Sequence, residues 1–388
     1  MSRPPQSRDP HILVLFSDTG GGHRSAAEAV VEALEAEHGG SFHHDMVDAF
    51  LAYAPYPLNK MPTWWPEMVR WPRAWEFVFR ASDGYGRSRA ITGTLWPWVQ
   101  NAARQLVREH PTDLILNFHP VFNAPVLRAL GKKRPPFITV VTDLVSTHAL
   151  WFHRRTDLCL VPTELARYRG LTCGLPPERV VVVGLPVKKR FCMPPGDKAA
   201  LRQQLGWPTD TRVVLVVGGA EGMGKLYETA REIERVNKNC AIAVIAGRNE
   251  ELRLRLQSAR WSLPTFIYGF VTEMPDLMRA ADLLVTKAGP GTISEALNAG
   301  LPMVLYSRLP GQEEGNVRYV VEEGAGLWAP GPQRTALAVA EMLANPPRLE
   351  AAALSCRRLA RPQAAEQVAR LSWDILQKPS YLAGSRKS

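Results

Sequence analysis

Short apolar runs alternate along the chain with longer stretches in which apolar residues recur every three or four positions. Such runs are typical of strands buried on both faces, and the longer stretches are typical of helices that cover a sheet. Strands that alternate with helices predict parallel sheets, and therefore an α/β fold. The first series of predicted strands comprises residues 11–16, 114–117, 137–142, 158–161 and 180–183.

The same alternation starts again after a stretch rich in glycine and proline between residues 184 and 197. We therefore expect two doubly wound domains, at residues 1–186 and 187–360, followed by a C-terminal helix and tail at 361–388. The final helix, at about 364–377, could pack back on the first domain. Ligands bind such domains at the carboxyl ends of their strands. The second series of predicted strands comprises residues 212–217, 241–246, 265–268, 283–286 and 303–306.

Residues 52–98 do not fit this alternation. The segment holds six of the eleven tryptophans, mixed with prolines and arginines, and has no clean helical or strand period. Tryptophan favours the membrane interface, and arginine is attracted to anionic headgroups. A single tryptophan is more often part of a core, but the prolines of this segment disfavour a regular core element. We therefore predict a membrane contact that includes Trp64 and Trp65.

The composition is that of an ordinary globular protein, with 46% hydrophobic and 22% charged residues, which argues against intrinsic disorder. The formal net charge of +10 favours an anionic partner, either nucleic acid, an acidic membrane face or a phosphorylated small molecule. No segment resembles a nucleic-acid-binding module, so we expect no nucleic-acid partner.

The cysteines and the apolar runs indicate the compartment. The five cysteines are scattered and form no C-x-x-C pair, which argues against a disulfide framework and a zinc site and favours a reducing compartment. The first ten residues lack the apolar region of a signal peptide, and no run approaches the roughly 18 apolar residues of a spanning helix. A membrane contact would therefore be peripheral.

A glycine turn follows the first predicted strand. Gly20, Gly21 and Gly22 allow the backbone to approach a ligand closely and leave amide N–H groups open at the start of a helix. His23, the next residue, can act as a general base. The alternative is a tight strand-to-helix turn without function. A nicotinamide enzyme is disfavoured because the third glycine of G-x-G-x-x-G would fall on Ser25.

A second turn of this kind precedes the helix after the strand at 283–286. Its residues are Gly289, Pro290, Gly291 and Thr292, and the open N–H groups and helix dipole at such a start suit a diphosphate. Glu295, one turn further on, can reach a ribose diol. The alternative is an ordinary capped helix with a favourable carboxylate in its first turn.

Two further segments of the second half could contact a nucleotide sugar. The glycine-rich stretch 218–224, with Gly219 and Gly222, follows a strand and lacks the ending of a P-loop. Gln312, Glu313 and Asn316 carry amide and carboxylate groups, which are suited to reading sugar hydroxyls. The alternative for the second segment is a solvated polar loop.

Together these motifs resemble those of monogalactosyldiacylglycerol synthases. That family lies among the glycosyltransferases of lipids and peptidoglycan precursors, which also include processive diacylglycerol glucosyltransferases. The chain departs from the family at residues 218–220, which read Gly-Gly-Ala where a third glycine is common. The resembling segments follow family order over about residues 11–330 and comprise 17–24, 141–144, 151–153, 184–187, 219–224, 286–293 and 311–317.

The resemblance implies the GT-B fold, in which two Rossmann-like domains face each other across a cleft, and inversion at the anomeric carbon without a bound metal or cofactor. It implies transfer of galactose from UDP-galactose to the sn-3 hydroxyl of 1,2-diacylglycerol, with anionic membrane lipids as further partners. The absence of a long leader favours a bacterial enzyme at the cytoplasmic face of the membrane. A UDP-glucose-dependent enzyme, a UDP-sugar 2-epimerase and a non-catalytic UDP-sugar sensor remain alternatives, and the oligomeric state stays open.

The resemblance also implies a role for each matching residue. His23 is the expected base, with Asp143 as its rival or orienting partner. The uracil is expected near Phe270 and Val271, the diphosphate at residues 289–292, the ribose at Glu295 and the sugar at residues 312–316. The acceptor half of the cleft is expected to include Gly21, Gly22, His148 and Trp151.

Overall fold

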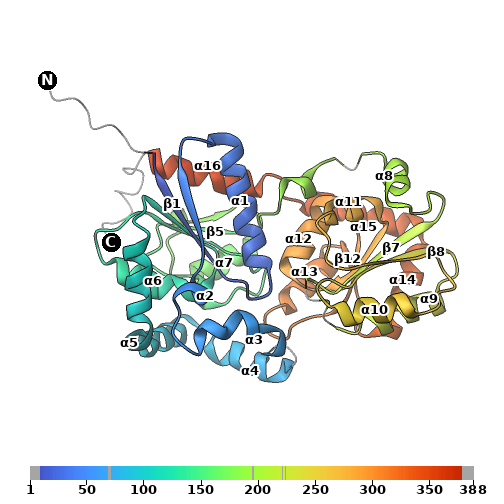
Figure 1. Ribbon diagram of the computed structural model, residues 1–388, viewed down its shortest axis with the longest axis horizontal. Helices are drawn as coiled ribbons and strands as arrows, with labels where there is room; N and C mark the ends of the chain where they lie inside the picture. Colours follow the sequence, from blue (N-terminus) through green and yellow to red (C-terminus); the bar gives the residue numbers. More distant parts are fainter. Residues whose placement is uncertain (1–8, 69–70, 195, 221, 223, 378–388) are drawn as a thin grey trace. The chain divides into compact units, whose positions relative to one another are not determined.

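The computed structural model describes residues 9–68, 71–194, 196–220, 222 and 224–377 (Figure 1). The described residues form two compact units. The first lies within residues 1–70, 77–188 and 363–388, and the second within residues 71–76 and 189–362.

The first unit is built on a parallel sheet of six strands in the order β2-β1-β3-β4-β5-β6. The central strands are wholly buried because helices cover both faces of the sheet, which explains their apolar runs. The edge strand β2 contains two histidines and two aspartates and therefore gave no apolar run to recognise. The strands are β1 (His11–Phe16), β2 (His43–Asp48), β3 (Leu114–Asn117), β4 (Phe137–Val140), β5 (Leu158–Val161) and β6 (Val180–Val182).

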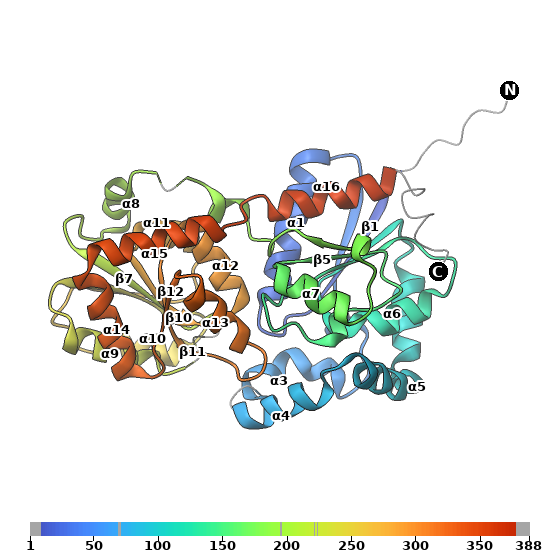
Figure 2. The same ribbon diagram turned by 180° about the vertical axis from the view of Figure 1, so that it is seen from behind.

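The C-terminal helix α16 (Ala364–Gln377) packs beside α1 (Gly22–His38), as both ribbon views show (Figures 1 and 2). Val368 and Ile375 of α16 join the buried cluster on this face of the first sheet. The ring of His38 stacks on Trp373 with 4.0 Å between their centroids. The chain therefore returns to the first unit after completing the second. The other helices that cover this sheet are α6 (Asn123–Leu130) and α7 (Glu164–Thr172).

The Trp-rich segment is helical, so the prediction that it lacks a regular period is wrong. Pro62 and Pro72 stand in first turns, whose N–H groups have no partner within the helix. Pro66 and Pro97 lie further inside α3 (Met61–Met68) and α5 (Tyr85–Glu109). The elements are α2 (Ala49–Tyr53), η1 (Leu58–Lys60), α3 (Met61–Met68), α4 (Pro72–Ser82) and α5 (Tyr85–Glu109).

The second unit holds another parallel six-stranded sheet, in the order β12-β11-β10-β7-β8-β9. This is the doubly wound order of the Rossmann fold. Val214 and Val216 pack with Ile233 of α9 (Leu226–Val236) and Val339 of α14 (Pro332–Ala344), two helices that lie side by side (Figure 2). The strands are β7 (Arg212–Val217), β8 (Cys240–Ile245), β9 (Thr265–Tyr268), β10 (Leu283–Lys287), β11 (Met303–Ser307) and β12 (Gly326–Trp328).

Eight helices of the second unit connect and cover these strands within the described part of the chain. They are α8 (Lys198–Leu205), α9 (Leu226–Val236), α10 (Glu250–Ser258), α11 (Met274–Ala280), α12 (Pro290–Ala299), α13 (Glu314–Glu322), α14 (Pro332–Ala344) and α15 (Pro346–Leu359).

A buried charge cluster ties α8 to the second sheet. Asp282, just before β10, is 5% exposed and accepts hydrogen bonds from Arg202, Lys198, Arg212 and the Val213 amide. Burial alone would raise the pKa of Asp282, but the Lys198 charge, the Val213 N–H and the Arg202 guanidinium together lower it. The carboxylate is therefore ionised and fully paired.

We expect Asp282→Asn to lower the free energy of unfolding by about 3–5 kcal/mol, because it leaves the buried Arg202 guanidinium without its counter-charge. Denaturant unfolding followed by tryptophan fluorescence measures the change. The control is Glu322→Gln, which breaks the exposed pair with Arg318 and should cost at most about 1 kcal/mol. A loss for Asp282→Asn no larger than that of the control would contradict the assignment.

Candidate functional site

Each sheet contains one point where the strand order reverses. In the first unit the connections diverge between β1 and β3, and in the second they diverge between β7 and β10. Ligands of open α/β sheets bind outside the carboxyl ends of the strands at such switch points. The glycine turn at residues 20–22 follows β1, and the 218–224 loop and the start of α12 follow β7 and β10. The predicted ligand-binding motifs thus lie at the switch point of each unit.

The glycine turn of the first unit needs glycine for two reasons. Gly20 and Gly21 have φ of 85° and 75°, a conformation that other residues rarely adopt. A Cβ on Gly20 would also lie 3.1 Å from the indole Nε1 of Trp65. The predicted membrane residue Trp65 therefore lies against the turn that precedes His23, whereas the neighbouring Trp64 is exposed.

His23 lies in the first turn of α1, beside residues from two other connections. Its Nδ1 is 2.7 Å from the hydroxyl of Thr142. Its ring meets that of His119 edge-on at 4.7 Å and lies 6.0 Å from that of Trp151. His119 in turn reaches the Thr19 hydroxyl through Nε2, at 3.3 Å. The fold thus gathers side chains that follow β1, β3 and β4 around one imidazole.

Burial keeps these imidazoles neutral. It lowers the pKa of His23 from 6.5 to about 4, although a hydrogen bond to the Phe118 backbone opposes the shift. Burial, together with the charge of a protonated His23, also lowers the pKa of His119 well below 6.5. At neutral pH His23 is therefore in the form that can accept a proton.

Asp143 and Trp151 form a buried pair. The indole N–H of Trp151 donates to Oδ2 of Asp143 at 2.7 Å. Asp143 is 6% exposed and Trp151 is fully buried. Trp151 therefore has no exposed surface with which to meet a membrane. Its indole N–H contacts the carboxylate of Asp143 instead.

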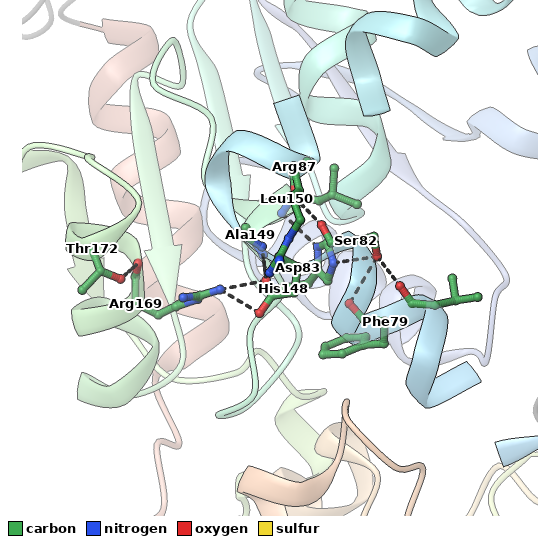
Figure 3. Close-up of polar contacts among 12 residues, drawn as sticks. Phe79, Ser82, Asp83, Arg87, His148, Ala149, Leu150, Arg169 and Thr172 are labelled. Atoms are coloured by element: carbon green, nitrogen blue, oxygen red, sulfur yellow. Dashed lines mark hydrogen bonds and ion pairs between the residues drawn. The ribbon is translucent and has the colours of Figure 1, made fainter. Parts of the chain in front are cut away.

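A network of polar contacts joins the Trp-rich helices to the loop that precedes Trp151 (Figure 3). Asp83, between α4 and α5, accepts from both the amide of Ala149 at 2.9 Å and the guanidinium of Arg169 at 2.8 Å. His148 lies 3.1 Å from the Ser82 hydroxyl through Nε2 and packs edge-on against Phe79. His148 is thus mostly buried beneath the end of α4. We call this set the Asp83 clasp.

Large apolar side chains are exposed along the same segment. Phe77 and Val78, which precede the clasp on α4, are each more than half exposed, and so is Trp71 at the residue before that helix. None of the helices described in the structure has the length and apolar character that crossing a bilayer requires. The other exposed large apolar residues of this segment are Leu51, Tyr56, Trp64, Ile91, Leu95 and Trp98.

The residues predicted to bind the sugar donor lie around the switch point of the second unit. Gly219 and Gly222 have φ of 77° and 57°, and a Cβ on Gly222 would collide with the carbonyl oxygen of Ala246 at 2.0 Å. Helix α12 begins at Pro290, and its N-cap, Gly289, has no side chain with which to cap the helix. The start of α12 is therefore without a side-chain cap, as binding of an anion there requires, whereas Gly222 is needed for close packing against Ala246.

The remaining residues of the predicted nucleotide site lie around these two turns. Gly291, Thr292 and Glu295 of α12 are half-buried. Phe270, which follows β9, is exposed, and the guanidinium of Arg248 lies over its ring at 4.3 Å, while its neighbour Val271 is half-buried.

Three residues of the 311–316 segment differ in exposure. Gln312 is half-buried, whereas Glu313 and Asn316 are 5% and 2% exposed. Glu313 accepts from the ammonium of Lys287 at 3.0 Å and from the amide of Leu309 at 2.7 Å. Asn316 donates to the Ala288 carbonyl at 2.9 Å, while its Oδ1 has no hydrogen-bond partner among the described residues. Both side chains thus face the loop that begins at Lys287.

Lys287 is the residue that sequence reasoning missed. It ends β10, where the register with β11 shifts so that it pairs with Ser307. The sequence could have indicated it, because Lys287 is a cation placed between the end of a predicted strand and a Gly-Pro-Gly turn. No three His, Cys, Asp or Glu side chains converge as a metal site would require in the part of the chain that is described.

Comparison with known proteins identifies the family. The model of the family Monogalactosyldiacylglycerol (MGDG) synthase matches residues 23–187, and that of the Glycosyltransferase family 28 C-terminal domain matches residues 213–367. Probable monogalactosyldiacylglycerol synthase 2, chloroplastic, of Oryza sativa subsp. japonica is 37% identical over 95% of this chain and 81% of its own length. This chain belongs to the monogalactosyldiacylglycerol synthase family. Monogalactosyldiacylglycerol synthase 2 of Arabidopsis thaliana is 36% identical over 92% and 79%.

Solved structures agree on the fold. Acinetobacter baumannii MurG superposes with a TM-score of 0.60 at 17% identity, covering 94% of this chain and 99% of its own. S. aureus MnaA, solved with UDP, gives 0.63 at 14% identity, covering 96% and 97%. Anabaena HepE, solved with UDP-glucose, gives 0.52 at 16% identity, covering 97% and 99%. These structures confirm the GT-B fold, whereas membership of the family shows that the chain is a glycosyltransferase.

Four histidines make the stability of the chain sensitive to acid. Burial is the largest cause that lowers the pKa of His23, His119, His148 and His153 below 6.5, to about 4 for His23 and His153. Between about pH 6.5 and pH 4 the unfolded chain binds more protons than the folded chain. The free energy of unfolding therefore keeps its full value above pH 6.5 and declines as the pH falls below it. We expect a loss of roughly 2 kcal/mol at pH 5 for each of His23 and His153.

Urea unfolding midpoints between pH 7.5 and 5 measure this dependence. His23→Gln should flatten it, whereas replacement of the exposed His43 should leave the slope unchanged. A midpoint that does not move between pH 7 and 5 would contradict the burial of neutral imidazoles.

Proposed function

We propose that the protein transfers galactose from UDP-galactose to the sn-3 hydroxyl of 1,2-diacylglycerol, with inversion, to give monogalactosyldiacylglycerol. Membership of the family supports the product, since the relatives that match over most of the chain are named for it. The UDP in the MnaA structure and the UDP-glucose in the HepE structure support a nucleotide sugar as donor. The observation that carries the proposal within this chain is the pair of glycine turns at the two switch points.

The proposed chemistry is a direct displacement. A base removes the proton of the lipid hydroxyl, whose oxygen attacks the anomeric carbon from the face opposite UDP. The bond between that carbon and the diphosphate oxygen breaks, and its electron pair leaves with UDP. The N–H groups of Gly291 and Thr292 at the start of α12 would stabilise the leaving charge. Donors of this kind contribute about 2.7–4 kcal/mol each.

His23 and Asp143 are the two candidates for the base. The imidazole of His23 is unprotonated at neutral pH and can accept a proton, although the burial that lowers its pKa to about 4 also makes it a weaker base. Asp143 already accepts the indole N–H of Trp151, which favours an orienting or electrostatic role for that carboxylate. We therefore assign the base to His23.

A lipid acceptor requires the enzyme to reach a bilayer. We propose a peripheral contact at the cytoplasmic face, made by the exposed apolar residues of the Trp-rich helices and by the cations around them. Tryptophan and phenylalanine at the surface contribute buried area at the interface, and arginine attracts anionic headgroups.

The test is a product assay with purified protein and diacylglycerol-containing liposomes, given UDP-galactose or UDP-glucose in separate reactions. We expect a β-linked galactolipid from UDP-galactose and little product from UDP-glucose, as identified by mass spectrometry and NMR of the lipid. A β-linked glucolipid as the main product would replace galactose by glucose in the proposal. An α-linked product would contradict inversion, and no lipid product from either donor would overturn the function.

We expect His23→Ala to lower transfer by about 10²–10⁴-fold, the usual contribution of a general base. The affinity for UDP should be unchanged, since the proposed donor site lies in the second unit. Initial rates and calorimetry measure the two quantities, and Asp143→Asn is the matched variant. If His23→Ala keeps transfer within threefold of the wild type while Asp143→Asn loses it, the base is Asp143.

A further inference from the structure

We propose that Lys287 contacts the diphosphate of the sugar donor and supplies positive charge to the leaving UDP. This inference rests on the proposed function and adds to it a catalytic residue that lies in the matching segment 286–293 but has no role assigned above. Lys287 ends β10 and directly precedes the loop that leads into α12. Its place at the switch point of the second sheet follows from the neighbouring order β10-β7.

The side chain of Lys287 lies between the two glycine turns of the donor half. A Cβ on Gly219 would stand 3.4 Å from Cε of Lys287, and a Cβ on Gly289 would stand 3.0 Å from its Nζ. The ammonium is therefore adjacent to the uncapped start of α12, and its stem runs beside the loop after β7. The side chain is 27% exposed, so a ligand at the turns can reach it.

Glu313 holds this ammonium in place. Its carboxylate is 3.0 Å from Nζ and is itself fixed by the Leu309 amide at 2.7 Å. An ammonium has three N–H donors. Lys287 can therefore keep its bond to Glu313 and still donate to a phosphate oxygen. In this arrangement Glu313 positions a cation, and it also balances that charge when no ligand is bound.

A second observation points to a ligand at the same loop. The carboxamide of Asn316 is buried and donates to Ala288, the residue after Lys287, while its Oδ1 has no partner among the described residues. Buried acceptors of folded proteins are almost always satisfied. A hydroxyl of a bound sugar donor would supply the missing hydrogen bond beside the ammonium.

The proposed role leaves the bond changes of the transfer as described and involves no proton transfer by Lys287. The ammonium stays protonated while negative charge grows on the diphosphate oxygen. The alternative is that Lys287 and Glu313 form a structural ion pair only. The two readings predict different affinities for UDP and uridine once the ion pair is removed. Only UDP carries the phosphates that Lys287 would contact.

The experiment compares the dissociation constants of UDP and uridine by calorimetry. Lys287→Gln alone leaves Glu313 buried without a counter-charge and could unfold the domain. We therefore pair it with the double variant Lys287→Gln/Glu313→Gln, which replaces the ion pair by two amides. Lys287→Arg tests rescue by another cation. Arg318→Gln, an exposed charge on α13, is the control for a general change of charge.

We expect the double variant to bind UDP about ten- to hundredfold more weakly than the wild type, as loss of a charged hydrogen bond implies. Uridine should bind as before, and Lys287→Arg should recover part of the UDP affinity. An unchanged ratio of the two constants in the folded double variant would overturn the role of Lys287 and leave the proposed function standing. A wild-type protein that binds neither ligand would instead overturn both.

Discussion

The structure depends on one geometric constraint of parallel sheets. Where neighbouring strands send their connections to opposite faces, the carboxyl ends of those strands are left uncovered, and that is where a ligand can meet the backbone. Both sheets of this protein place glycine turns at that point, and Gly20, Gly21 and Gly219 adopt positive φ there. A side chain at Gly20 would meet Trp65, and one at Gly289 would meet Lys287. The open backbone of the site is therefore a property of topology and glycine together.

The two units surround their switch points with different electrostatics. In the first, His23 and His119 are held neutral by burial, and the nearby Asp143 is paired with an indole. In the second, Lys287 and the uncapped start of α12 lie in one loop, and the buried carboxylate of Glu313 reaches Lys287 from the next connection. A neutral alcohol and a charged diphosphate need these two kinds of surroundings, because desolvation is cheap for the first and an unpaired charge is costly for the second. The proposed acceptor and donor halves agree with this division.

Much of the fold could be predicted from apolar runs, and the exceptions have physical reasons. The strands at 11–16 and 212–217 have the bounds of β1 and β7, since both are buried on both faces. The edge strand β2 was not predicted because most of its residues are polar. The Trp-rich helices were not predicted because many of their apolar residues are exposed, so their pattern shows no buried face. The contact between His23 and Thr142 joins residues 119 positions apart, and no local pattern encodes it. Lys287 was missed because its partner Glu313 lies on another connection.

The helix α4 links the surface of the first unit to its candidate site. Phe77 and Val78 are exposed, whereas Phe79, two residues from Phe77, packs against His148. Just beyond the helix, Asp83 holds the Ala149 amide. The short turn η3 (Ala149–Trp151) that begins there carries the indole that binds Asp143. A force on the exposed side of α4, such as insertion at a lipid interface, would therefore act through the Asp83 clasp on Asp143. The loop at residues 149–151 is held by Asp83 at one end and by Asp143 at the other, so it cannot shift alone. Under the proposed function, the membrane contact and the acceptor site are therefore parts of one packed unit.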